Sequence, residues 1–266
     1  MKKFWGFLLV IVLMTSCGEY QSLLKSNDYN LVYKKAIEYY NKGDYQRAMN
    51  LLDGVRSVFV GQAKAQNIAY YRAFCSYNMK DYQIASDLFK QFIQTYPESS
   101  FAEECLYMMG FCDYKASPKP RLDQQVTEKA IREFQLYLSR YPYSMRKDKV
   151  NTYMDEMRDK LSYKAYLSAK NYYLREHYKA AVISLQNCLK DYQGSKYREE
   201  IMYMLFVSKY QMAVNSVEDK KVERYNNARE EYYYFADEYP NSRYAADVKK
   251  MYEDIEAYLE NYKFED

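Results

Sequence analysis

The sequence is poor in the residues on which most catalytic and metal sites depend. Its 266 residues include one histidine, one tryptophan and seven glycines. The histidine, His177, lies in a predicted turn. No serine, cysteine or carboxylate pair stands at a spacing suited to nucleophilic catalysis or metal binding. No glycine-rich loop that could hold a phosphate is present. We therefore expect a protein without enzymatic activity, metal or cofactor.

The net charge argues against nucleic-acid binding, and the cysteine spacing argues against a C-x-x-C site. The net charge is +3 and both signs are interspersed, so the sequence lacks the basic patch that nucleic-acid binding requires. None of the cysteines forms a C-x-x-C pair, and Cys105 and Cys112 stand seven apart on one predicted helix, too far along its axis for a disulfide. Because Cys75, Cys105, Cys112 and Cys188 all lie in apolar stripes, we expect buried thiols; a long-range disulfide is the alternative.

The sequence is rich in tyrosine, with 35 residues, and much of it repeats. Residues 67–97 hold two helical patterns joined by the polar stretch 78–81, with apolar residues recurring every three or four positions. Ala73 and Ala85 leave room for the two helices to approach closely. This pattern predicts an antiparallel helical hairpin. One such hairpin cannot bury its own apolar face, so it requires neighbours.

Related copies of this hairpin follow one another along the chain. Each has small residues on its helices, a G-D-Y-x-x-A-like turn or a variant of it, and most copies end in Tyr-Pro, as at Tyr96-Pro97 and Tyr239-Pro240. This is the tetratricopeptide signature. It predicts an all-α fold: a superhelical solenoid of five helical hairpins, closed by a C-terminal capping helix over residues 245–262.

Two departures from the repeat divide the chain. The third copy carries the insertion Ser117-Pro118-Lys119-Pro120-Arg121-Leu122-Asp123-Gln124, in which two prolines favour an extended loop. Residues 144–174 keep helical spacing without glycine or proline, which predicts one long helix or two nearly continuous ones. We expect an N-terminal three-repeat part over residues 28–143. Residues 144–266 then form the long linking helix, two C-terminal repeats and the capping helix.

The N-terminus has the pattern of a bacterial lipoprotein signal. A short positive segment and an apolar core precede Leu13-Met14-Thr15-Ser16-Cys17, which resembles a lipobox. This predicts a signal peptide over residues 1–16, removal of that segment, and lipidation of Cys17. Residues 17–27 then form a lipid-anchored tether. A plain secretory signal with an incidental cysteine is the alternative.

Paired tyrosines are the candidate binding site. They recur at positions i and i+7 on the first helix of each copy, and so share one face of that helix. In the three N-terminal copies the pairs are Tyr33 and Tyr40, Tyr70 and Tyr77, and Tyr107 and Tyr114. Two interpretations are open. The rings either form an aromatic groove for an extended peptide, or pack sideways on the neighbouring repeat.

The lipobox, the five copies, the Pro-rich insertion, the long middle helix and the ending Y-x-x-F-A-D-E-Y-P-N-S-R-Y together resemble the BamD family of outer-membrane assembly factors, in a Bacteroidota-like version. The resemblance implies a non-enzymatic lipoprotein of the β-barrel assembly machine (BAM complex), anchored in the outer membrane and facing the periplasm. It also implies partners: the POTRA domains of BamA, other BAM lipoproteins and unfolded outer-membrane β-barrel proteins.

Sites can be carried over from the resemblance by region. The resemblance implies that the six N-terminal tyrosines named above bind the C-terminal strand of unfolded barrel proteins. Contact with BamA falls in the fifth copy, on Lys220, Glu223, Arg224, Arg229 and Tyr232.

Other tetratricopeptide lipoproteins share the repeat pattern. A secretin pilotin and a cell-wall coordination factor are the leading alternatives, which the Pro-rich insertion and the two-repeat C-terminal part disfavour. A periplasmic glycan-binding protein of the SusD kind is a third class, normally about twice as long.

Overall fold

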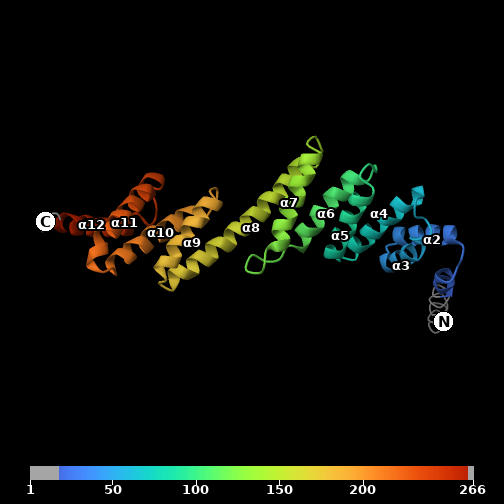
Figure 1. Ribbon diagram of the computed structural model, residues 1–266, viewed down its shortest axis with the longest axis horizontal. Helices are drawn as coiled ribbons and strands as arrows, with labels where there is room; N and C mark the ends of the chain where they lie inside the picture. The colour runs from blue at the N-terminus through green and yellow to red at the C-terminus, as the bar shows by residue number, and fades with distance from the viewer. Residues whose placement is uncertain (1–17, 263–266) are drawn as a thin grey trace, which may run out of the picture. The chain divides into compact units, whose positions relative to one another are not determined.

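The computed structural model describes residues 18–262, which are helical almost throughout (Figure 1). The helices and their bounds are α2 (Tyr29–Asn41), α3 (Tyr45–Val55), α4 (Ala63–Asn78), α5 (Tyr82–Thr95), α6 (Ala102–Ala116), α7 (Gln125–Arg140), α8 (Lys147–Leu174), α9 (Tyr178–Asp191), α10 (Arg198–Val214), α11 (Glu218–Glu238) and α12 (Ala245–Tyr262). In this range, no helix is both long and apolar enough to cross a bilayer.

The prediction of an all-α tetratricopeptide solenoid is confirmed. Five hairpins follow one another (α2/α3, α4/α5, α6/α7, α8/α9 and α10/α11), and α12 follows as a single helix over the predicted residues. The Pro-rich insertion forms the loop between α6 and α7, where proline cannot continue a helix.

The tight turn inside three hairpins explains the recurring G-D-Y motif. Gly43, Lys80 and Glu176 each adopt a positive φ, of 81°, 68° and 59°. The next backbone N–H bonds back to a carbonyl five residues earlier, as from Asp44 to Tyr39 and from Asp81 to Ser76. This is a Schellman-type ending, which favours glycine at the left-handed position. His177 fills the corresponding turn position before α9, so it serves as a turn residue.

Small residues lie where the helices of a hairpin cross. Ala48, Ala85, Ala130 and Ala181 on the second helices are fully buried. Gly110 on α6 shows why size matters: a Cβ added there would lie 2.8 Å from the ring carbon Cδ1 of Phe134. Close approach of the backbones therefore depends on these positions remaining small.

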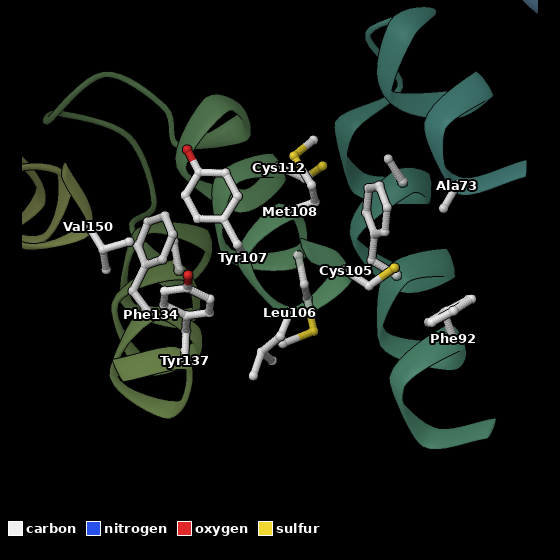
Figure 2. Close-up of a cluster of buried hydrophobic side chains, with 14 of the residues drawn as sticks. Ala73, Phe92, Cys105, Leu106, Tyr107, Met108, Cys112, Phe134, Tyr137 and Val150 are labelled. Carbon is white, nitrogen blue, oxygen red and sulfur yellow. The ribbon is translucent and has the colours of Figure 1, made fainter. Parts of the chain in front are cut away.

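The chain divides into two compact units, and the division falls inside α8. The first comprises residues 18–118 and 123–157, and the second residues 119–122 and 158–262. α8 supplies Val150, Met154 and Met157 to the core of the first unit, and Tyr166 and Ala169 to a core of the second. Figure 2 shows the first core, where Tyr107 of α6 lies beside Phe134 and Tyr137 of α7.

Two segments differ from their predicted form. Residues 18–24, expected to be a tether, are helical, and Tyr20 and Leu23 are buried on the first hairpin. The reason is local: the two side chains are three residues apart and so share a helical face. The repeat spacing also predicts a charged insertion around residues 216–225, between the two helices of the fifth copy. Most of it lies in the first turns of α11, which is 21 residues long.

The crossing geometry can be tested at two glycines. We expect Gly110→Ala to lower the free energy of unfolding by about 1–2 kcal/mol, because overpacking against the buried Phe134 ring outweighs the gain in helix propensity. Gly54→Ala is the matched control. Gly54 lies exposed inside α3 with no atom within 4 Å of an added Cβ. The Gly54→Ala substitution should stabilise the protein by about 0.5–1 kcal/mol. Urea unfolding measures both, and equal stabilisation by the two variants would contradict this geometry.

Candidate functional site

The six N-terminal tyrosines lie on the first helices of the first unit, as the spacing predicts. Tyr33 and Tyr40 are on α2, Tyr70 and Tyr77 on α4, and Tyr107 and Tyr114 on α6. Tyr107 is buried, and the other five are partly buried. Every one of these rings lies within contact distance of another aromatic ring.

Tyr70 shows what the first tyrosine of each pair does. Its ring centroid lies 4.5 Å from that of Phe101, the residue directly before α6. Its hydroxyl donates to Glu104 Oε2 at 2.8 Å, on the first turn of the same helix. Burial, and next the hydrogen bond to Glu104, raise the pKa of Tyr70. The side chain therefore joins one repeat to the next by both its ring and its hydroxyl.

The same contact recurs in later copies. Tyr166 stacks on Tyr197 at 4.4 Å and 12°, and Tyr203 stacks on Tyr244 at 4.0 Å and 10°. In the third copy the partner is a cation, since the Arg146 guanidinium lies 4.9 Å from the centre of the Tyr107 ring. We call this contact the inter-repeat clasp: a first-helix tyrosine packed on the residue that directly precedes the first helix of the next repeat or, after the last repeat, the capping helix α12.

The partner residue is held in place by a repeated exit turn. The four exit turns are residues 96–101, 141–146, 192–197 and 239–244, and each has serine at its fourth position. In each, the backbone N–H of the last residue donates to that serine hydroxyl, at 3.0 to 3.3 Å. The clasp thus depends on a fixed turn as well as on the tyrosine.

The second tyrosine of each pair also contacts the following repeat. The Tyr40 ring centroid lies 4.9 Å from that of Tyr71, and the Tyr40 hydroxyl accepts a hydrogen bond from Asn78. Burial raises the pKa of Tyr40 to about 12. Tyr77 lies 6.2 Å from Phe111. Tyr114 stacks on Tyr153 of α8 at 4.5 Å and donates to Glu156. These contacts are those of the second interpretation, sideways packing on the neighbouring repeat.

The sequence predicted where the tyrosines lie but missed their partners. Phe101, Arg146, Tyr197 and Tyr244 are the missing half of the site. Their signal was the serine and the aromatic or basic residue that follow the first tyrosine of each exit turn at a fixed distance.

Of the α11 residues assigned to BamA, three already make contacts within the second unit. Arg224 donates to the Met212 carbonyl at 3.3 Å, and Arg229 lies 3.6 Å from Glu256 of α12. Tyr232 stacks on Tyr252 at 4.0 Å and 11°. Lys220 and Glu223 are exposed, so they form the accessible part of this surface.

The remaining polar chemistry is that of a packed interior. Cys75, Cys105, Cys112 and Cys188 are buried free thiols, and burial raises the pKa of each. No group of three or more metal-ligating side chains occurs within residues 18–262.

A buried ionic group lies between α6 and α7. Lys129 lies 2.8 Å from Asp113 and 3.6 Å from Glu133. Burial and the Asp113 carboxylate raise the pKa of Glu133 to about 8. Lys129 offsets part of the repulsion between the Asp113 and Glu133 carboxylates, so the group serves the packing of the hairpin.

The lipidation site assigned to Cys17 lies outside the described residues.

Comparison with known proteins identifies a family. The model of the YfiO family, described as an outer membrane lipoprotein, matches residues 25–201. No curated protein matches the chain.

Several solved structures match this chain. A TPR-repeat protein from Bacteroides fragilis is 14% identical, with a TM-score of 0.42, and the match covers 87% of this chain and 99% of that one. The TPR2AB domain of yeast Sti1, in complex with pHSP90, is 14% identical with a TM-score of 0.39, and the match covers 86% of this chain and 98% of that one. Human IFIT1, bound to PPP-AAAA, is 17% identical with a TM-score of 0.30, covering 94% and 63%.

The clasp can be tested at Tyr70. We expect Tyr70→Ala to lower the free energy of unfolding by about 2–3 kcal/mol, since it removes a partly buried ring. Tyr70→Phe loses only the hydroxyl bond to Glu104 and should cost about 1 kcal/mol. Tyr143→Ala is the control, because that ring is 97% exposed and should not affect stability. A Tyr70→Ala protein that unfolds with the parent would show that the ring does not clasp the next repeat.

Proposed function

The chain belongs to the YfiO family of outer membrane lipoproteins, and from this membership we propose that it is a BamD-type scaffold of the BAM complex. In this role it binds the POTRA domains of BamA and receives unfolded outer-membrane proteins for folding and insertion as β-barrels. The other BAM lipoproteins are further partners. A lipid on Cys17 holds it at the periplasmic face of the outer membrane.

The observation that carries this proposal is the extent of the family match. It runs from residue 25 to residue 201, through the first unit and into α10 of the second. It therefore includes the insertion between α6 and α7 and the long helix α8, the two features that distinguish this chain from a uniform repeat array.

We place substrate reception on the first unit. Because the rings of the six N-terminal tyrosines are packed against neighbouring repeats, an extended segment meets their exposed edges and hydroxyl groups and does not insert between the rings. Tyr107 is 7% exposed and acts only by supporting its neighbours. Direct contact falls on the partly buried members, Tyr33, Tyr40, Tyr70, Tyr77 and Tyr114.

We place BamA on α11 of the second unit. Lys220 and Glu223 make the direct contacts, since both are exposed. Three side chains keep α11 in position against α10 and α12: Arg224 by a hydrogen bond, Arg229 by an ion pair and Tyr232 by ring stacking. Exposed charges of this kind act mainly on partner choice and on the rate of association.

Binding to purified POTRA domains of BamA from the same organism tests this assignment. We expect Lys220→Ala with Glu223→Ala to weaken binding about 5- to 10-fold, because two charged contacts together contribute on the order of 1 kcal/mol. Lys249→Ala with Glu253→Ala, an exposed pair on α12, is the matched control and should bind like the parent. A parent chain that does not bind the POTRA domains contradicts the proposed function. Equal binding by both variants contradicts only the placement on α11.

A further inference from the structure

The exit turn between α7 and α8 exposes two large side chains almost completely. Tyr143 is 97% exposed and Met145 is 103% exposed. The next most exposed large hydrophobic residue of the described chain is Val60, at 74%. Exposing two large side chains to water costs free energy, which a protein without a partner at this surface would avoid. The pair therefore points to an interaction surface.

Comparison of the four exit turns shows that the turn itself does not require these residues. The position of Tyr143 holds Glu98, Gly194 and Asn241 in the other turns, and the position of Met145 holds Ser100, Lys196 and Arg243. All four turns keep the same serine and the same hydrogen bond to it. The apolar pair is therefore specific to the third copy.

The turn that carries the pair is firmly held. Ser144 donates to Glu103 Oε1 at 2.7 Å and also bonds the Tyr137 hydroxyl. Arg140 donates to the Pro97 carbonyl at 3.0 Å. Arg146 lies over the Tyr107 ring as part of the inter-repeat clasp. The backbone on both sides of Tyr143 and Met145 is thus fixed before any partner arrives, which lowers the entropic cost of binding.

The surroundings of the pair are basic. Arg140, Arg146, Lys147 and Lys149 flank it in the sequence, against Asp148. Two carboxylates of α6 also reach the turn, Glu103 through Ser144 and Glu104 through Arg146. The equivalent turn before α6 has the opposite character, with Glu98, Glu103 and Glu104. Lys147 and Lys149 are both exposed, so their charge faces outward. A partner for this turn therefore presents carboxylates around an apolar surface.

We propose that the exit turn 141–146 is a docking site for a folded protein, which takes Tyr143 and Met145 into an apolar cleft rimmed by carboxylates. These carboxylates face Lys147 and Lys149. Tyrosine is one of the residues enriched in binding hot spots. The site lies in the first unit and is separate from the α11 surface assigned to BamA.

A basic and aromatic turn could also meet an anionic lipid surface. Within the first unit, the turn lies at the edge opposite to the helix of residues 18–24 (Figure 1). A lipid on Cys17 would hold that helix, not the turn, near the membrane. The choice of a protein over a lipid surface thus rests on the lipid anchor of the proposed function.

Photocrosslinking with the full-length lipoprotein in its own cells tests the proposal. Benzoylphenylalanine replaces Tyr143 or Met145, and in a control it replaces Asn241, the equivalent position of the last exit turn. Crosslinked peptides are identified by mass spectrometry. We expect one protein adduct, formed from positions 143 and 145 and not from 241, whose crosslinked peptide carries Asp or Glu beside apolar residues.

Charge reversal then tests the stated chemistry. Lys147→Glu with Lys149→Glu should reduce the adduct at least tenfold, and replacing the partner's carboxylates by lysine should restore it. Tyr143→Ser with Met145→Ser should melt with the parent, which excludes loss of folding as the cause. Adducts to lipid alone, no discrete adduct, or an adduct unaffected by charge reversal would each overturn the proposal. Failure here leaves POTRA binding through α11 unaffected, so the two proposals fail separately.

Discussion

The structure depends on one contact, the packing of a first-helix tyrosine on the residue that begins the next repeat. A tetratricopeptide hairpin buries only part of its apolar surface alone, so solenoid stability is the sum of repeat terms and interface terms. Here the interface term comes from rings such as Tyr70 on Phe101 and Tyr203 on Tyr244. The serine of each exit turn fixes the second ring, and the small residues at the helix crossings set the distance between neighbouring helices. The high tyrosine content therefore serves the interfaces between repeats.

This constraint separates the surfaces that hold the fold from those left for partners. The six N-terminal tyrosines pack against neighbouring repeats, and five of them leave part of the side chain exposed to a partner. Arg224, Arg229 and Tyr232 contact α10 and α12. Among the residues that we assign to protein partners on α11 and on the third exit turn, the exposed ones are Lys220, Glu223, Tyr143 and Met145. A scaffold built in this way can vary exposed positions without disturbing the contacts between its repeats.

Much of the fold could be predicted from the sequence, because hairpin spacing, buried alanines and helix-ending prolines are local signals. The last helix occupies the predicted residues, and the Pro-rich insertion is the predicted loop. The direction in which Tyr70 or Tyr107 points could not be predicted, since periodicity identifies the face of a helix and not the neighbour it meets. The packing of Tyr20 and Leu23 was missed because the helix of residues 18–24 has fewer than two turns, too few to show a period. The Tyr143 and Met145 pair stands out only when the exit turns are aligned with one another.

A double-mutant cycle on Tyr203 and Tyr244 tests the central claim most directly. These rings stack at 4.0 Å and 10° between α10 and the residue before α12. If the clasp couples neighbouring repeats, the losses in unfolding free energy of Tyr203→Ala and Tyr244→Ala should be non-additive by about 0.5–1.5 kcal/mol. Tyr203→Ala combined with Tyr143→Ala should be additive, because the Tyr143 side chain is 97% exposed. Additive losses for Tyr203 and Tyr244 as well would contradict the account, because the two rings would then stabilise their own repeats independently.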